Sequence, residues 1–371
     1  MKTLDQRLAA IALVAITLYV LACGPAFSPD GRRILVTSTD TNGVSRVLMF
    51  DRKTSGWTLL AQRRGEEHAS ETPLAAALWL PDGRHAVVQW WREKGMQVMV
   101  LPIGEAGPTR LFDVPDLEDN VGPFVLSPPI VRGRLLIGGQ SLRALDLKTG
   151  DLTEHPLQLP TGETNDMEVL VHAQQDGAYC IYGKNQDLTI GRVNSASLAV
   201  TPVLKLEDID DGGFFFAVCP KSKRLAVVVE KEGNPIVRIY KAQLLEREIR
   251  LGTGEKTVAF GNLAWSPDGR TLYAATFEKA ALDGDRALFG VHELPADGGT
   301  PRQIPLFAVK IKGETPLYHQ FALSPDGKAL AAFGGVFLDE KTVGEKDWAL
   351  FLADLSRPDR RVKKYPIPSR K

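Results

Sequence analysis

Cysteine is scarce in this chain: three residues among 371, at positions 23, 180 and 219. Cys23 directly follows an apolar N-terminal segment, which leaves Cys180 and Cys219 for the rest of the chain. Two cysteines are too few for a disulfide framework in a chain of this length. Free cysteine behaves as a small and mostly buried apolar residue, so we expect both to be core residues, with one Cys180–Cys219 disulfide as the alternative.

An excess of charge of either sign is also missing. The sequence has 45 Lys and Arg residues against 45 Asp and Glu residues, so its formal net charge is zero. Proteins that bind DNA or RNA usually carry a basic surface, because they neutralise phosphates. We therefore expect no nucleic-acid partner.

The short motifs that mark common catalytic sites are missing as well. The sequence contains no G-x-S-x-G nucleophile elbow, no P-loop and no dinucleotide-binding glycine motif. Its six histidines show neither the H-x-H nor the H-E-x-x-H spacing, and 208-DIDDGG-213 lacks the spacing and the final Glu of a calcium loop. We predict no catalytic residues, no cofactor and no metal site. The alternative is that His172 and His319 converge on a metal.

The N-terminus carries an apolar segment, 8-LAAIALVAITLYVLA-22, that follows two basic residues. Its length fits the apolar region of a secretory signal better than a membrane span, which needs about 20 residues. The stretch 20-VLAC-23 resembles the lipoprotein signal of bacteria, in which the cysteine becomes the lipidated first residue. We expect lipid attachment at Cys23, with cleavage after Ala22 or an uncleaved anchor helix as alternatives. Each of these places the following domain in the bacterial cell envelope, outside the cytoplasm.

Glycine and proline are abundant, with 34 and 24 residues, and many of them recur in one phrase. The phrase is 26-AFSPDGRRILVTS-38, and it returns as 78-LWLPDGRHAVVQW-90, 264-AWSPDGRTLYAAT-276 and 322-ALSPDGKALAAFG-334. In S-P-D-G, proline presets the φ of the first central turn position, aspartate suits the second, and glycine supplies the positive φ that follows. Each copy therefore predicts a turn that closes a β-hairpin, not a catalytic loop.

Two further runs follow each hairpin. A third apolar run, such as 47-VLMFD-51 or 349-ALFLADL-355, often ends near an acidic residue before a second turn, and a fourth run closes the unit. Aligned on the turn proline, successive units lie 45 to 58 residues apart; the aligned positions are Pro29, Pro81, Pro128, Gln175, Pro220, Pro267 and Pro325. Four strands that recur at about 40 to 50 residues are typical of a β-propeller blade.

The fold class that we predict is all-β: a single seven-bladed β-propeller of four-stranded antiparallel blades, preceded by an N-terminal signal or anchor helix. Residues 1–22 form the signal or anchor segment, and residues 23–371 form the propeller. The approximate blades are 24–70, 71–117, 118–162, 163–208, 209–256, 257–313 and 314–371.

These units resemble the WD-repeat-like blades of TolB-like propellers and of the propeller domains of prolyl-oligopeptidase-type peptidases. The resemblance covers residues 24–371 and lies in the repeating blade motif alone. TolB-like proteins carry an α/β domain ahead of the propeller, and the peptidases carry a hydrolase domain; we expect neither in this chain. The resemblance therefore implies the propeller fold and transfers neither an activity nor a partner.

The segments that join consecutive blades are rich in carboxylates. Segments 63–73, 113–123, 160–168 and 205–213 hold 14 acidic residues against 3 basic residues. Such loops surround one mouth of a propeller's central channel and commonly carry binding. We expect an acidic rim that binds a small cationic ligand or a basic protein surface, with ordinary solvated loops as the alternative. The candidate binding residues are Asp116, Glu118, Asp119, Asp166, Asp208, Asp210 and Asp211.

The function that these patterns favour is a non-catalytic, envelope-associated scaffold that binds a protein or a ligand as a monomer. A hydrolase or lyase with an active site assembled at the channel mouth is the alternative. We expect membrane contact through the N-terminus. Ring closure further suggests that the basic segment 357-RPDRRVKKYPIPSRK-371 lies beside Cys23 and attracts anionic lipid, with a solvated tail as the alternative.

Overall fold

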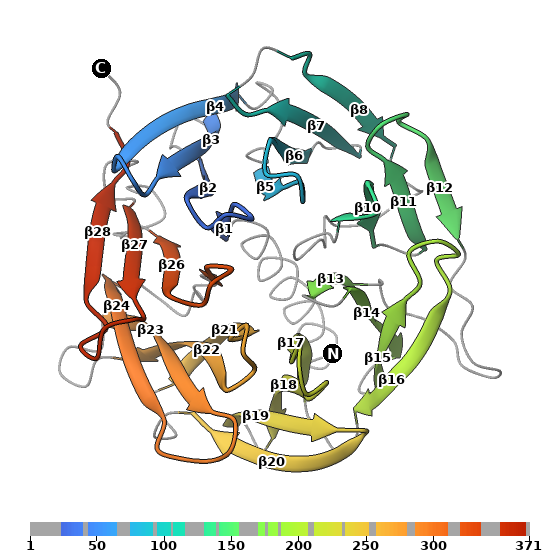
Figure 1. Ribbon diagram of the computed structural model, residues 1–371. Coiled ribbons are helices and arrows are strands. Elements are labelled where there is room, and N and C mark those ends of the chain that lie inside the picture. Colours follow the sequence, from blue (N-terminus) through green and yellow to red (C-terminus); the bar gives the residue numbers. More distant parts are fainter. Residues whose placement is uncertain are drawn as a thin grey trace, which may run out of the picture.

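The computed structural model of the chain is a seven-bladed β-propeller whose blades follow one another around a central axis (Figure 1). It describes residues 24–39, 44–64, 75–91, 95–104, 107–115, 130–138, 141–155, 170–174, 177–184, 187–206, 211–231, 234–251, 257–279, 286–310, 320–334 and 349–368. The predicted all-β fold of seven four-stranded antiparallel blades is confirmed. No helix occurs within these ranges, and the predicted N-terminal signal or anchor helix lies outside them.

Each blade is one antiparallel sheet whose strands follow one another from the axis outward. The first three blades consist of β1 (Ala26–Phe27), β2 (Arg33–Thr39), β3 (Val44–Asp51) and β4 (Gly56–Arg64); β5 (Ala75–Trp79), β6 (His85–Trp91), β7 (Met96–Pro102) and β8 (Arg110–Val114); and β9 (Ile130–Val131), β10 (Arg134–Ile137), β11 (Leu142–Asp146) and β12 (Leu152–His155).

The remaining four blades repeat this order. They consist of β13 (Leu170–Gln174), β14 (Gly177–Lys184), β15 (Asp187–Val193) and β16 (Val200–Leu206); β17 (Asp211–Val218), β18 (Leu225–Lys231), β19 (Asn234–Lys241) and β20 (Leu244–Arg250); β21 (Thr257–Trp265), β22 (Thr271–Lys279), β23 (Arg286–Pro295) and β24 (Arg302–Lys310); and β25 (Phe321–Leu323), β26 (Ala329–Gly334), β27 (Ala349–Asp354) and β28 (Val362–Pro366).

The S-P-D-G turns between the first and second strands are closed by a repeated set of hydrogen bonds. In blade one, the Gly31 amide donates to the Ser28 carbonyl oxygen at 2.8 Å. The Ser28 hydroxyl donates to Asp30 at 2.5 Å and accepts from the Arg33 amide at 2.8 Å. The hydrogen bond from Ser28, followed by one from the Arg32 amide, holds the pKa of Asp30 below its usual value. The carboxylate therefore stays charged and keeps the turn closed.

The same bonds recur in blades six and seven, which explains why the phrase repeats. Ser266 donates to Asp268 at 2.6 Å, and Ser324 donates to Asp326 at 2.5 Å. Blade two has leucine in place of the serine, and its Asp82 accepts two backbone amides and lies 2.7 Å from His85 Nδ1. The phrase marks hairpins, as its turn chemistry predicts.

In blades one, three and four, a carboxylate or amide side chain closes the turn between the third and fourth strands. Asp51 accepts the amides of Lys53 and Thr54 at 2.8 and 3.3 Å. Asp146 and Asn194 accept the amides two and three residues further along in the same way. The acidic residue at the end of the third run is therefore part of the turn.

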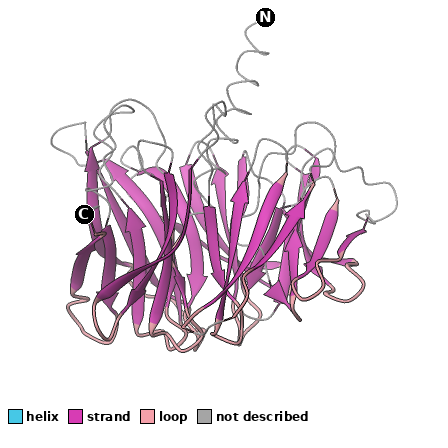
Figure 2. Cartoon of the chain, turned by 90° about the horizontal axis from the view of Figure 1, so that it is seen from above, coloured by secondary structure: helices cyan, strands magenta, loops and turns pink. Residues whose placement is uncertain are grey.

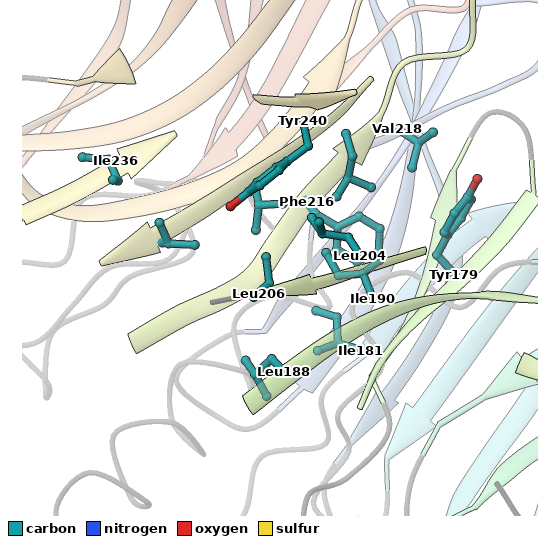
Figure 3. Packing of buried hydrophobic residues seen from close by; sticks show 13 residues of the cluster. Tyr179, Ile181, Leu188, Ile190, Leu204, Leu206, Phe216, Val218, Ile236 and Tyr240 are labelled. Atoms are coloured by element: carbon teal, nitrogen blue, oxygen red, sulfur yellow. The ribbon is translucent and has the colours of Figure 1, made fainter. Parts of the chain in front are cut away.

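The core consists of apolar side chains that fill the spaces between neighbouring blades. Figure 3 shows one such cluster, in which Ile181, Ile190 and Leu204 of blade four pack with Phe216 and Ile236 of blade five. The second strand of each blade lies between two such clusters, so it is buried on both faces. This burial accounts for the nearly continuous apolar runs that follow each S-P-D-G turn.

Cys180 and Cys219 are free and fully buried. Cys180 belongs to the cluster between blades three and four, whereas Cys219 belongs to the cluster between blades five and six. Burial raises the pKa of the Cys180 thiol to about 12, so this thiol is protonated at neutral pH. The prediction of two core cysteines is confirmed, and their disulfide is excluded.

Inner strands of neighbouring blades are also joined by side chains that bond to backbone. Trp79 and Trp265 each donate an indole N–H to an inner-strand carbonyl oxygen of the preceding blade, at 3.0 Å. Asn262 of blade six donates to the Phe321 carbonyl oxygen at 2.7 Å and accepts the Phe321 amide at 3.0 Å. These side chains fix the position of each of these blades, along the propeller axis, relative to its neighbour.

Turn glycines lie against the turn of the preceding blade in the ring. A Cβ added to Gly31 would lie 3.5 Å from Pro325 Cδ, and one added to Gly269 would lie 2.7 Å from Cys219 Sγ. The φ values of the two glycines are 69° and 71°. Glycine is required at Gly269 because no other residue combines a left-handed backbone with so close an approach.

The ring closes between blade seven and blade one without an exchange of strands, because each of the two sheets takes its four strands from consecutive sequence. The ring of Phe50 lies 4.7 Å from that of Tyr365 and 5.0 Å from that of Trp57, between centroids. Arg52 donates to the Gly31 carbonyl oxygen at 2.6 Å, within the turn that Pro325 touches. Closure therefore depends on side-chain packing.

We expect Gly269→Ala to destabilise the propeller more than Gly133→Ala. Both glycines have positive φ, of 71° and 77°, but nothing lies within 4 Å of a Cβ at Gly133. The free energy of unfolding of Gly133→Ala should then fall by about 1 kcal/mol, through backbone strain alone. In Gly269→Ala the new Cβ also overlaps with Cys219, so the free energy of unfolding should fall by about 2 kcal/mol or more. Denaturant unfolding measures both; equal losses would contradict the contact between blades five and six.

Candidate binding faces

The two faces of the propeller differ in the strand ends that they present. The turns between first and second strands, and between third and fourth strands, gather on one face, which we call the turn face (Figure 2). The remaining strand ends lie on the other side, which we call the opposite face. The described turn-face segments are 28–32, 52–55, 80–84, 103–104, 107–109, 132–133, 147–151, 194–199, 219–224, 242–243, 266–270, 296–301, 324–328 and 355–361.

Charge is divided between these two faces although the chain is neutral as a whole. The described turn-face segments hold 14 Lys and Arg residues against 7 Asp and Glu residues. The stretches of sequence that join the strand ends of the opposite face hold 23 acidic residues against 6 basic residues. The neutral total therefore combines basic turn-face segments with acidic connecting sequences, and most of the acidic sequences lie outside the described ranges.

Most of the predicted acidic rim lies outside the described ranges. Asp211 is the first residue of β17, at the opposite-face end of the innermost strand of blade five, where it pairs in register with Glu230. The other candidates, Asp116, Glu118, Asp119, Asp166, Asp208 and Asp210, lie outside the described ranges. Ligand binding by this rim stays a prediction.

The first described residue, Gly24, lies on the opposite face and close to the axis. β1 runs from there into turn 28–32, so its first residue is at the strand end away from the turn face. A Cβ added to Gly24 would lie 2.8 Å from the Cβ of Gln320, which precedes the inner strand of blade seven. Cys23 lies outside the described ranges, within which no helix has the length and apolarity to cross a membrane. A lipid on Cys23 would be attached at the opposite face.

The basic C-terminal segment begins on the turn face, and β28 then carries it back toward the opposite face. Arg360 and Arg361 belong to the turn before β28, so they lie on the turn face. Ring closure brings blades seven and one together, but β1 is the innermost strand of one and β28 the outermost strand of the other. Three steps of about 4.8 Å between strands separate inner from outer edge by about 14 Å. The basic turn and Gly24 therefore lie apart, on different faces.

Arg360 serves as a contact between blades six and seven. Its φ is 49°, and its Nε donates to Glu293 Oε1 at 3.0 Å. Glu293, whose side chain is 9% exposed, also accepts the Tyr273 hydroxyl at 3.3 Å. Burial, followed by the charge of Glu293, raises the pKa of Tyr273 above its usual value. This group of three joins the two blades, so Arg360 is not available to a lipid surface.

Buried histidines are structural as well. His172, on the innermost strand of blade four, packs edge-on against Phe216 of blade five with 4.7 Å between ring centroids. Burial lowers the pKa of His172 to about 3, so the ring is neutral. His292 lies 3.2 Å from Glu278, and burial lowers its pKa as well. His319 lies outside the described ranges, within which no group of three or more metal-ligating side chains occurs.

We expect protonation of His172 to destabilise the propeller. Its folded-state pKa of about 3 is below the value of 6.5 for an ordinary histidine, so the stability it contributes is complete above pH 6.5 and is lost as the pH falls toward 3. Protonation of His172 should lower the free energy of unfolding by as much as about 1.4 kcal/mol for each unit by which the pH falls. Urea unfolding between pH 6.5 and 4.5 should show a shallower fall for His172→Gln. Parallel slopes would contradict the assignment.

Comparison with known proteins finds no matching family model and no matching curated protein. Solved structures do match. A proposed 6-phosphogluconolactonase from Bacteroides uniformis has a TM-score of 0.54 at 16% identity, over 90% of this chain and 97% of the other. The β-propeller domain of Cps50 (Swd1) from Myceliophteria thermophila has a TM-score of 0.54 at 14% identity, over 84% of this chain and 93% of the other.

TolB from Acinetobacter baumannii has a TM-score of 0.49 at 12% identity, and the match covers 91% of this chain but 64% of TolB. The propeller fold that the repeats predict is confirmed by the seven four-stranded sheets, and the Cps50 propeller domain is among the similar solved structures. At identities this low, likeness shows the fold alone. The chain is similar to these proteins in fold, and its own seven sheets give the number of its blades.

Proposed function

We propose that the protein is a non-catalytic binding scaffold of the bacterial cell envelope, held at the membrane by a lipid on Cys23. Its opposite face binds a basic protein surface or a small cationic ligand. The observation that carries this proposal is the division of charge, with 23 acidic against 6 basic residues in the stretches that join the strand ends of this face. Charge of one sign gathered on one side raises the local concentration of oppositely charged partners.

The place where the chain enters the propeller narrows the kind of partner. Gly24 lies on the opposite face, one residue after Cys23. A lipid on Cys23 turns this acidic face toward the bilayer, whose anionic lipids repel it. The surface that fits between the two is a basic one, such as the exposed loops of a membrane protein.

The buried ionisable groups that the structure describes support a scaffold, because they already serve contacts within and between blades. Glu293 binds Arg360 and Tyr273 across two blades. Arg238, with 5% of its side chain exposed, donates to Glu248 at 2.8 Å within blade five. Groups held in this way stabilise the fold. No observation within the described ranges favours the alternative of a hydrolase or lyase at the channel mouth.

Replacing Asp208, Asp210 and Asp211 together with Asn should weaken binding of a lysine-rich peptide to the propeller prepared without residues 1–23. We expect at least a threefold loss of affinity at low salt and a shallower dependence on salt, since exposed charges act over a Debye length of about 10 Å. Fluorescence anisotropy of the labelled peptide measures both quantities.

A matched control replaces three turn-face carboxylates, Asp151, Asp297 and Asp359, with Asn. This variant has the same net charge as the first, but its changes lie on the other side of the molecule. We expect its affinity for the lysine-rich peptide to change by less than twofold, because the removed charges lie more than a Debye length from the opposite face. An equal loss in both variants would assign binding to overall charge and overturn the proposed role of the opposite face.

Cys23→Ser should abolish lipid attachment. We expect the wild-type protein to incorporate labelled palmitate and to remain with membranes after a high-salt wash, and the variant to remain unlabelled. N-terminal sequencing of the mature protein is the second measurement. A free N-terminus at Cys23 would establish ordinary cleavage after Ala22 and remove the lipid from the proposal, while the peptide experiment would still decide the binding role.

A further inference from the structure

The face of blade six that packs against blade five carries several polar side chains. Ala274 and Leu294 of this face belong to the apolar cluster between blades five and six. Alternate residues of a strand share a face, and residues that pair in register lie on the same side of their sheet. By this register, the polar residues of the same face are Thr276, Glu278, His292 and Gln303.

Gly290 lies on this face as well and pairs in register with Thr276. A Cβ added to Gly290 would lie 3.2 Å from Gln303 Nε2 and 3.3 Å from the Ile304 carbonyl oxygen. Gly290 is not among the glycines with positive φ, so its backbone conformation does not require glycine. Glycine is needed here for the space that the Gln303 amide takes up.

His292 and Glu278 reach each other across the pair formed by Thr276 and Gly290. His292 Nε2 lies 3.2 Å from Glu278 Oε1, although the two residues stand on either side of this pair in the strand register. Burial lowers the pKa of His292, so its ring is neutral at neutral pH. A neutral ring can donate a hydrogen bond to the Glu278 carboxylate, but it offsets none of the negative charge.

No lysine or arginine pairs with Glu278 in the part of the chain that the structure describes. The side chain of Glu278 is 24% exposed, so a cation can approach it from solvent. Arg247 of blade five also faces this interface, but its Nη1 donates to the Pro295 carbonyl oxygen at 3.2 Å. Pro295 is the turn-face end of β23, whereas Glu278 is one residue from the opposite-face end of β22. Glu278 therefore keeps a negative charge that a cation from outside can meet.

Two buried polar atoms on this face have no hydrogen-bond partner among the described residues. Thr276 is fully buried, and its hydroxyl oxygen is one of these atoms. Gln303 Nε2, which lies against Gly290, is the other. Folded proteins contain few such atoms, because each loses its hydration without gaining a hydrogen bond. A half-turn of the Gln303 amide brings its oxygen to the same position, so both side chains can accept hydrogen bonds.

We propose that Glu278, Thr276 and Gln303 bind a primary ammonium group that enters between blades five and six. An ammonium carries a full positive charge and three N–H donors. The three side chains offer three oxygens, of which the Glu278 carboxylate supplies the charge and the strongest hydrogen bond. His292 is a positioning residue, because its hydrogen bond holds this carboxylate beside Thr276.

This site deepens the function proposed for the opposite face and rests on it. The partner proposed there is a basic protein surface or a small cationic ligand, and a lysine side chain and a small amine present the same ammonium group. A metal ion fits less well, since a stable site needs three or four ligands. The described ranges hold no group of three or more metal-ligating side chains.

Two labelled peptides test the proposal against the full-length protein in detergent. Both alternate lysine and serine over 12 residues, and the second has trimethyl-lysine in place of lysine. Trimethylation keeps the charge but removes every N–H donor, so we expect the second peptide to bind at least fivefold more weakly. Cadaverine, added as a competitor, distinguishes the sources of the ammonium. Displacement of the first peptide assigns the site to small amines as well, and no displacement assigns it to a lysine side chain.

Three variants locate the binding. Glu278→Gln keeps an acceptor for His292 but removes the charge, and it should weaken the lysine peptide at least fivefold. Thr276→Val should weaken it at least threefold, whereas Thr276→Ser, which retains the hydroxyl, should stay within twofold of the wild type. The matched control is Asp359→Asn, which removes one carboxylate from the turn face and should also stay within twofold.

Thermal unfolding of Thr276→Val is a second measurement. This change replaces a buried hydroxyl that has no partner among the described residues with a methyl group of similar shape. We therefore expect the midpoint of unfolding not to fall. A fall of more than about 3 °C would show that the hydroxyl is already bound within the fold, and would overturn its role in the site.

Equal affinity of the wild type and Glu278→Gln for the lysine peptide would overturn this site. If the variant with Asn at Asp208, Asp210 and Asp211 has lost affinity in the same experiment, the function proposed for the opposite face stands without it; if neither variant has, both are overturned. Equal binding of the two peptides would reduce recognition to charge and also overturn the site. Zinc binding in calorimetry that Glu278→Gln abolishes, with peptide binding retained, would assign the cluster to a metal.

Discussion

The propeller depends on the fit between neighbouring blades, because no strand is shared across the junction that closes the ring. Backbone hydrogen bonds of each sheet stay within one blade, so packing between the sheets holds the ring together. The turn side carries several of the specific contacts, including the approach of Gly31 to Pro325 and the pair of Arg360 with Glu293. A larger side chain that overlaps its neighbour at one such contact displaces both of the blades that meet there. The turn face is therefore a fixed frame on which charges keep their positions.

The repeating part of this structure could be predicted from the sequence because its causes are local. Ser28, Asp30 and Gly31 close one turn with bonds that span at most five residues, and the same bonds recur in blades six and seven. The blade count follows from the spacing of these turns. Burial of Cys180 could also be predicted, since the apolar run of a second strand is enclosed by blades on both sides, and Cys219 stands where Ser28 and Ser324 of the repeated phrase are buried.

Contacts between blades could not be predicted in the same way. Arg360 and Glu293 lie 67 residues apart, and nothing in either repeat marks them as partners. His172 was a candidate for the channel because it lies near an inner strand, yet alternate residues of a strand face opposite neighbours, and this one meets Phe216. The turn-face position of Arg360 and Arg361 could not be predicted from ring closure either, because closure shows which blades are neighbours, whereas strand direction decides the face.

Strand direction also decides how the two faces sit relative to a membrane. β1 has to run toward the turn face to enter its S-P-D-G hairpin, so the chain before it necessarily leaves from the opposite face. On the function that we propose, a lipid on Cys23 would share this side with the acidic rim, and the rim and an anionic bilayer would repel each other. A basic partner placed between them would relieve this repulsion, and the anchor would raise the partner's effective concentration by confining both to the membrane surface. Anchor and rim would then act as two halves of one site.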